Sequence, residues 1–174
     1  ANSLYQKIKS KGYKYNHPII PPLYVLISMT ALIYIPFSGE VTYDPFLILF
    51  IFMLIWISDT MSYFFGSLFG RNNLKIEASP NKTWEGFIGG LFCSVFFSYL
   101  SFYFIQEIFP FWKTILLGFT IPIFGLYGDI VQSKIKRKAG VKDSGNIIPG
   151  HGGLFDRLDS AIGNSFFVLI ITIL

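Results

Sequence analysis

Long apolar runs without any charged residue constrain this sequence more than any other feature. Gly86–Gln106 spans 21 residues without a charge, and Ile19–Gly39 spans another 21 that only prolines interrupt. A helix of roughly 20 mainly apolar residues is long enough to cross a bilayer. Charged residues make up 14% of the chain, compared with about 25% in soluble domains. We therefore predict a membrane protein and not a large soluble all-α domain.

The spacing of the apolar runs predicts an all-α fold, a polytopic bundle of about five transmembrane helices in one domain. The expected helices are Pro21–Phe37, Pro45–Gly70, Trp84–Ile108, Phe111–Gly128 and Leu158–Leu174. The chain begins without Met and stops inside an apolar run, so we expect it to be part of a longer protein. Its one cysteine, Cys93, excludes a disulfide within the chain.

The positions of the basic residues support this topology and orient it. Cytoplasmic segments of membrane proteins are enriched in Lys and Arg. If the N-terminus is cytoplasmic, 13 of the 14 basic residues lie on that side, and Lys113 is the exception. Residues 1–17 then form a basic cytoplasmic lead, and residues 129–157 form a polar cytoplasmic segment. The sequence thus predicts an integral, multi-pass protein whose functional groups face the cytoplasm.

Two pairs of glycines are spaced so that helices can approach closely. Gly66 and Gly70 lie in one apolar run, Gly86 and Gly90 lie in the next, and three residues separate the members of each pair. Small residues at this spacing let helix backbones come together in lipid. The spacing permits a homodimer as well as contacts within the chain.

Asp129 stands where the fourth apolar run meets a basic stretch, Ser133–Arg137. One interpretation is a solvated helix end whose carboxylate pairs with a nearby Lys or Arg. The other is a metal ligand, because Mg²⁺ prefers carboxylate oxygens and keeps several positions for water and phosphate.

A glycine-rich segment, Pro149–Ser160, follows further along the chain. Its glycines free the backbone to approach a ligand, and successive N–H groups in such a loop bind anions. Asp156, Asp159 and Ser160 are spaced to share one face of a helix. Two carboxylates beside an anion site indicate a metal-bridged phosphate. The alternative is a glycine-rich turn before a capped helix, with His151 as a simple loop residue.

Two further segments carry polar groups into the apolar part of the chain. Thr83 precedes an apolar run, and we expect it either to cap a helix or, with Lys82, to bind phosphate at a helix N-terminus. Asp59 lies roughly 18 Å from Arg71 along a straight helix, which places it deep in the hydrocarbon. A carboxylate at that depth indicates a polar cavity, unless it only makes a structural hydrogen bond to a neighbouring side chain.

Together these segments resemble the signature of the phosphatidate cytidylyltransferase (CDP-diacylglycerol synthase) family. The resemblance is strongest over Ser133–Asp159, where Ser-x-Ile-Lys-Arg, Lys-Asp and Pro-x-His-Gly-Gly-Leu-x-Asp-Arg-Leu-Asp keep the family's spacing. Ser58–Arg71 and Ser79–Gly86 are similar to two other family segments. Gln132 departs from the pattern, since the family commonly has Glu before this Ser, and one carboxylate is thereby lost.

The resemblance implies transfer of CMP from CTP to phosphatidic acid, which forms CDP-diacylglycerol and pyrophosphate in phospholipid biosynthesis. Residues 1–174 would form a single membrane-embedded catalytic domain. The implied metal ligands are Asp129 and Asp156, and the further catalytic residues are Lys142, Asp143, Arg157 and Asp159. The implied substrate-binding residues are Ser79, Lys82, Thr83, Lys136, Arg137, His151, Gly152, Gly153, Asp59 and Ser133.

The same resemblance implies the cofactor, the partners and the location. The expected cofactor is Mg²⁺, with room for a second cation such as K⁺. The expected partners are CTP, phosphatidic acid and membrane lipids, with no nucleic acid. In a eukaryotic cell the expected location is the endoplasmic reticulum.

Other functions remain open at this point. A CTP-dependent lipid kinase has a similar membrane core but would transfer the terminal phosphate of CTP. A transporter or channel would use Asp59 to line an ion path, yet it needs no glycine-rich phosphate loop and no cytoplasmic cluster of Lys and Arg. A third alternative is a fragment that is inactive without the spans it lacks.

Overall fold

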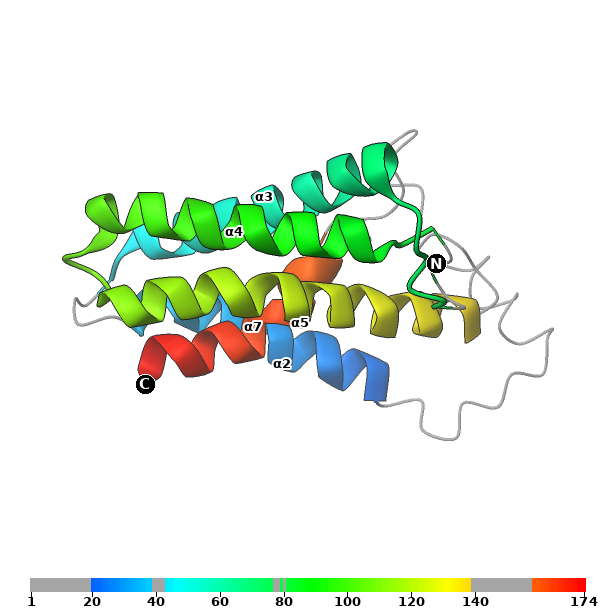
Figure 1. The fold of residues 1–174 in the computed structure, drawn as a ribbon. Coiled ribbons are helices and arrows are strands. Elements are labelled where there is room, and N and C mark those ends of the chain that lie inside the picture. Colours follow the sequence, from blue (N-terminus) through cyan, green and yellow to red (C-terminus); the bar gives the residue numbers. More distant parts are fainter. Residues whose placement is uncertain (1–19, 39–42, 77–78, 80, 139–157) are drawn as a thin grey trace, which may run out of the picture.

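The computed structural model describes residues 20–38, 43–76, 79, 81–138 and 158–174. Within these residues the chain forms five α-helices, one short 3₁₀ helix and an isolated β-bridge. The elements are α2 (Ile20–Tyr34), η1 (Ile35–Phe37), α3 (Pro45–Phe69), α4 (Trp84–Ile105), α5 (Phe111–Lys138) and α7 (Asp159–Ile173). The helices lie side by side as a bundle (Figure 1), which confirms the predicted all-α class.

Local sequence signals determine where α3 and α4 begin. Asp44 accepts a hydrogen bond of 2.8 Å from the main-chain N–H of Phe46. Pro45 occupies the first turn of α3, where a main-chain N–H would have no carbonyl partner within the helix, so the missing N–H of proline costs no hydrogen bond. Thr83 caps α4 by accepting a hydrogen bond of 3.2 Å from the N–H of Gly86. The interpretation of Thr83 as a helix cap is thereby confirmed.

Small residues form the contact between the antiparallel helices α3 and α4. A methyl group at Gly86 would lie 2.6 Å from the Ser62 carbonyl oxygen, and one at Gly90 would lie 2.7 Å from the Ser58 carbonyl oxygen. Gly66 lies against Thr83 and Gly86 at the start of α4. Larger side chains here would push the two backbones apart, so the close approach that the glycine spacing predicts is confirmed.

A second glycine contact joins α5 to α7. The Cα of Gly163 lies 2.5 Å from the position that a Cβ on Gly128 would take, so neither residue can carry a side chain unless a backbone moves. Phe124 and Phe167 stack further along the same two helices, with ring centroids 3.4 Å apart. This contact determines where the start of α7, at Asp159, lies along α5.

The sequence predicts that the fourth helix ends at Gly128, and this prediction is wrong because α5 continues to Lys138. Gly128 is an interior residue of the helix, and its missing side chain serves the contact with Gly163. Residues 129–138 contain neither Gly nor Pro and include Gln, Lys and Arg, which are good helix formers. The basic residues after Asp129 therefore extend the helix and do not begin a loop.

Three helices are long and apolar enough to cross a membrane: Pro45–Phe69, Trp84–Ile105 and Phe111–Arg137. Two shorter apolar helices, Pro22–Phe37 and Asp159–Ile173, pack with them. The described residues thus form five apolar helices, the number that the sequence predicts. Besides the end of α5, the clearest differences from the predicted bounds are at two other helix ends: α4 ends at Ile105 and not at Ile108, and α2 ends at Tyr34 and continues as a 3₁₀ turn.

The connections place the described basic residues mainly at one end of the bundle. The α3–α4 loop, the end of α5 and the start of α2 lie together on the right in Figure 1. This end carries Arg71, Lys75 and Lys82 in the loop and Lys134–Lys138 on α5. Lys113 lies at the start of α5, at the opposite end. The helix directions therefore agree with the predicted segregation of charge.

Candidate functional site

A cavity of about 550 Å³ opens among α3, α4, α5 and α7, and the α3–α4 loop forms part of its wall. Its volume lies within the usual range for ligand sites, roughly 300–1,000 Å³. The charged and hydroxyl side chains of its lining include Asp59, Lys82, Thr83, Asp129, Asp159 and Ser160. The structure thus brings five of the predicted site residues, and the neighbouring Ser160, around one space.

The α3–α4 loop holds Lys82 on a well-anchored main chain. A β-bridge between Asn73 and Thr83 joins the two ends of the loop, and the N–H of Leu74 donates to the carbonyl oxygen of Lys82 at 2.8 Å. Asn72 adds further hydrogen bonds between the same two ends. The position of the Lys82 backbone is therefore set by the loop, while its side chain extends toward the cavity.

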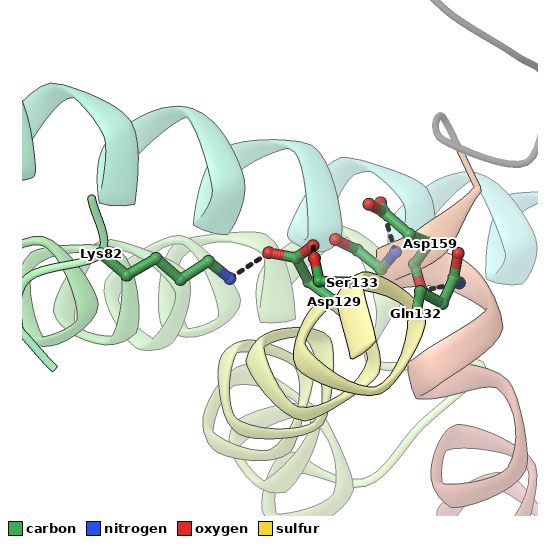
Figure 2. A network of polar contacts seen from close by, with 6 residues as sticks. Lys82, Asp129, Gln132, Ser133 and Asp159 are labelled. Carbon is green, nitrogen blue, oxygen red and sulfur yellow. Dashed lines mark hydrogen bonds and ion pairs between the residues drawn. The ribbon is translucent and has the colours of Figure 1, made fainter. Parts of the chain in front are cut away.

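An ion pair joins this loop to α5 (Figure 2). The Nζ of Lys82 contacts Oδ2 of Asp129, and the hydroxyl of Ser133 donates to the other carboxylate oxygen, Oδ1, at 3.3 Å. Both charged side chains are partly buried, with 28% of Lys82 and 24% of Asp129 exposed. Solvent and salt therefore screen this pair less than a pair on an open surface. The cation that neutralises Asp129 comes from a loop that is distant in the sequence.

The continuation of α5 places several predicted site residues on one face of the helix. Asp129, Ser133 and Lys136 follow one another at spacings of four and three residues. The ammonium group of Lys136 interacts electrostatically with the carboxylate of Asp159 on α7. Arg137 is exposed near the end of the helix.

A buried amide ties the start of α7 to α5. Gln132 is fully buried, and its Nε2 donates to the main-chain carbonyl oxygen of Asp159 at 3.2 Å (Figure 2). Within the described residues, the Oε1 of Gln132 has no hydrogen-bond partner. The Asp159 carboxylate accepts a hydrogen bond of 2.8 Å from the N–H of Ser160. Gln132 thus acts as a donor, a role that an ionised Glu cannot fill.

Asp59 lies on α3 and lines the same cavity. Its carboxylate interacts electrostatically with those of Asp129 and Asp159 and with the ammonium group of Lys82. The structure therefore places a polar cavity at this carboxylate, which the sequence puts within a membrane-spanning helix.

The described lining of the cavity carries more negative than positive charge. Three carboxylates, of Asp59, Asp129 and Asp159, face one ammonium group, that of Lys82. Such a space attracts cations, and it repels phosphate unless cations offset the carboxylates. Carboxylate and hydroxyl oxygens are also the ligands that Mg²⁺ prefers. The oxygen atoms around Asp129 therefore fit a hard divalent cation.

The described residues supply only part of a metal site. Among them, no three His, Cys, Asp or Glu side chains gather closely enough to hold a metal ion. The second predicted ligand, Asp156, lies outside the described residues. So do the other predicted site residues of the glycine-rich segment and its approach: Lys142, Asp143, His151, Gly152, Gly153 and Arg157.

Ser79 belongs to the α3–α4 loop, and its described contacts are made by its main chain. Its carbonyl oxygen accepts a hydrogen bond of 3.4 Å from the N–H of Lys82. Among the described residues that line the cavity, Lys82 and Thr83 are present and Ser79 is not. Ser79 therefore supports the loop that presents Lys82.

Several polar residues that line the cavity are absent from the predicted site, and Ser62 and Asn81 are two of them. Ser58, Ser62 and Gly66 recur every four residues, so they share one face of α3. This row of small residues in an apolar helix was a usable signal for Ser62. Asn81 stands in a loop next to Lys82, where no periodicity distinguishes it.

Comparison with known proteins places the chain in a family. The sequence model of the cytidylyltransferase family matches residues 2–174. A phosphatidate cytidylyltransferase of Staphylococcus haemolyticus (strain JCSC1435) is 48% identical over 113 residues, which cover 65% of this chain and 44% of the relative. That of Staphylococcus aureus (strain COL) is 50% identical over 115 residues, with the same two coverages. The match thus spans less than half the length of these relatives. Because the family model extends over almost the whole chain, this protein belongs to the cytidylyltransferase family.

Proposed function

We propose that the protein transfers CMP from CTP to phosphatidic acid and forms CDP-diacylglycerol and pyrophosphate in phospholipid biosynthesis. The observation that carries the proposal is the meeting of Lys82 and Asp129 on the wall of a cavity within a bundle of apolar helices. A cation suited to phosphate and a carboxylate suited to a metal ion face the same space. The name of the similar staphylococcal proteins supports the choice of lipid substrate.

The proposed reaction joins two anions, so charge neutralisation is its main requirement. An oxygen of the lipid phosphate attacks the α-phosphorus of CTP, the bond from that phosphorus to the bridging oxygen breaks, and pyrophosphate leaves. The lipid phosphate is already ionised near neutral pH, so the step requires no strong general base. Positioning and electrostatic stabilisation supply most of the acceleration.

The residues of the chain divide these tasks. Lys82 and Lys136 would hold phosphate oxygens, because Lys82 lines the cavity and the ammonium group of Lys136 interacts electrostatically with the carboxylate of Asp159, which also lines it. Mg²⁺, when bound by Asp129 and Asp156, would supply positive charge beside the reacting phosphates. Ser133 orients the Asp129 carboxylate through its hydrogen bond.

Negative charge remains in the cavity beyond that of Asp129. Asp59 and Asp159 also line it, so the proposal leaves room for a second cation such as K⁺. The predicted phosphate contacts of the glycine-rich segment belong to the same proposal, and so do the roles of Lys142, Asp143 and Arg157. CTP and phosphatidic acid are the proposed partners.

The proposed location is an integral, multi-pass position with the cavity facing the cytoplasm. This orientation puts the basic end of the bundle on the side where Lys and Arg are enriched. In a eukaryotic cell it would correspond to the endoplasmic reticulum. The small-residue faces of α3 and α4 are occupied by each other, so a homodimer would have to form through a different face.

The test follows two phosphorus labels in parallel. Full-length protein in lipid nanodiscs is incubated with phosphatidic acid, Mg²⁺ and CTP labelled at the α- or the γ-phosphorus, and the organic phase is counted. CMP transfer carries the α label into the lipid and leaves the γ label in aqueous pyrophosphate. Entry of the γ label would indicate a lipid kinase instead. If neither label enters the organic phase, the proposal is overturned.

A pair of variants links the activity to the cavity. Asp129→Asn is expected to lower transfer of the α label by roughly 100-fold, because it removes charge stabilisation at the reacting phosphates. Glu107→Gln makes the same chemical change at an exposed position at the opposite end of the bundle, and it should leave transfer unchanged. Equal activity of the two variants would remove Asp129 from the proposed site.

A further inference from the structure

Lys82 and Asp129 neutralise each other in this structure. The Nζ of Lys82 contacts Oδ2 of Asp129, so the ammonium group in the described lining of the cavity is already paired. In the proposed function, on which this inference rests, each of the two groups binds a different partner. A phosphate must take the ammonium group, and a metal ion must take the carboxylate. The pair must therefore separate when the substrates bind.

A metal ion that arrives alone meets an obstacle at Asp129. It must displace Lys82, and the displaced ammonium group stays close because hydrogen bonds anchor its main chain at the end of the α3–α4 loop. The unpaired ammonium then repels the metal ion. Both side chains are about three-quarters buried, so water screens this repulsion only in part.

A nucleotide that arrives alone meets the opposite obstacle. A phosphate that takes Lys82 leaves Asp129 without its counter-ion. The carboxylates of Asp59 and Asp159 line the same cavity, so three negative charges then face the phosphates. Removing one partner from an ion pair leaves the other charge uncompensated, and the cost rises with the burial of the pair.

When both ligands arrive, each takes one member of the pair and the charges stay balanced. We propose that Lys82 and Asp129 form an exchangeable counter-ion pair that couples the binding of metal ion and nucleotide. The metal ion replaces Lys82 at Asp129, and a nucleotide phosphate replaces Asp129 at Lys82. Such coupling is reciprocal, and each ligand raises the affinity for the other by the same factor, typically about 5- to 150-fold.

Two single-ligand titrations test the exchange without any turnover. In the first, Mn²⁺ alone is titrated onto the protein in phosphatidylcholine nanodiscs, and the free ion is measured by electron paramagnetic resonance. Lys82→Met removes the internal competitor and is expected to bind Mn²⁺ about 5-fold more tightly, or better, than the wild type. Lys82→Arg keeps a cationic partner and should retain the wild-type affinity.

In the second titration, labelled CTP is bound in the presence of EDTA. Asp129→Asn frees Lys82 and reduces the negative charge, so this variant is expected to bind metal-free CTP about 5-fold more tightly, or better, than the wild type. A nucleotide whose phosphates bind away from Lys82 and Asp129 would show no such gain in affinity. Glu107→Gln controls for the loss of a negative charge elsewhere on the molecule.

Lys75→Met is the matched control for the first titration, because Lys75 is an exposed residue of the same loop. The proposal is overturned if Lys82→Met binds Mn²⁺ no more tightly than Lys75→Met. It is also overturned if Asp129→Asn binds metal-free CTP no more tightly than Glu107→Gln. Thermal unfolding and size-exclusion profiles establish that each variant is folded.

These affinities are measured without phosphatidic acid, so their outcome is separate from that of the label-transfer experiment. If the label is transferred and the affinities do not shift, the exchange is wrong and the reaction stands. If the affinities shift and neither label enters the lipid, the pair exchanges and the proposed reaction is wrong.

Discussion

The side-chain amide of Gln132 donates a hydrogen bond of 3.2 Å to the main-chain carbonyl oxygen of Asp159, and so fastens the first residue of α7 to α5. Gly128 and Gly163 touch on the same two helices. These contacts set the position of α7 along α5 and thereby bring the Asp159 carboxylate to the cavity that Asp129 also lines. The charge pattern of the site thus depends on how two helices pack.

Gln132→Glu is expected to destabilise the protein in metal-free buffer. The carboxylate has no N–H to donate, and it would bring a buried negative charge beside the carbonyl oxygen of Asp159. The expected loss is about 3 kcal/mol or more, measured by thermal unfolding in detergent. Gln106→Glu, at an exposed helix end, should stay within about 0.5 kcal/mol of the wild type. Equal stability of the two variants would show that the amide donor is dispensable.

Gly128→Ala is expected to cost about 1–3 kcal/mol, because the new Cβ would be forced into the backbone of α7. It would lie 2.5 Å from the Cα of Gly163. Gly125→Ala makes the same change one turn earlier, where the nearest atom is the side-chain amide of Asn164 at 3.0 Å, which can shift. Thermal unfolding should therefore rank Gly128→Ala as the less stable variant. The reverse order would contradict the close contact between α5 and α7.

Thr83→Val is expected to weaken the start of α4 by about 1 kcal/mol, because it removes the cap and keeps the shape of the side chain. The hydroxyl of Thr83 accepts the N–H of Gly86, so hydrogen exchange at that amide should become faster. Thr83→Ser keeps the hydroxyl and should retain wild-type exchange. Unchanged exchange in Thr83→Val would mean that the cap does not protect the helix start.

Asp59→Asn is expected to raise the melting temperature of the metal-free protein. It removes one of the three carboxylates that face a single ammonium group in the described cavity lining. Each kcal/mol of relieved repulsion corresponds to about 2–4 °C in a protein of this size. Added Mg²⁺ should then stabilise the variant less than the wild type. A lower melting temperature would instead support a structural hydrogen bond at Asp59, and Glu107→Gln serves as the charge control.

Much of the fold was predictable from the sequence because its signals are local. A long run without charge must satisfy every backbone N–H within lipid, and a helix does this with its own carbonyl groups. The apolar runs therefore determined the all-α class and the five helices. The cap at Thr83 and the small-residue spacing around Gly66 and Gly86 are local signals of the same kind, and the structure contains both.

The partners within the site were decided only by the tertiary structure. The contact of Lys82 with Asp129, the hydrogen bond from Gln132 to Asp159, and the use of Gly128 inside a helix all join segments that are distant in the sequence. Such contacts depend on the depth and rotation at which helices cross, and these follow from the fit of whole side-chain surfaces. Hydropathy reports that a helix is apolar, but it carries no information about which residue on a neighbouring helix lies opposite.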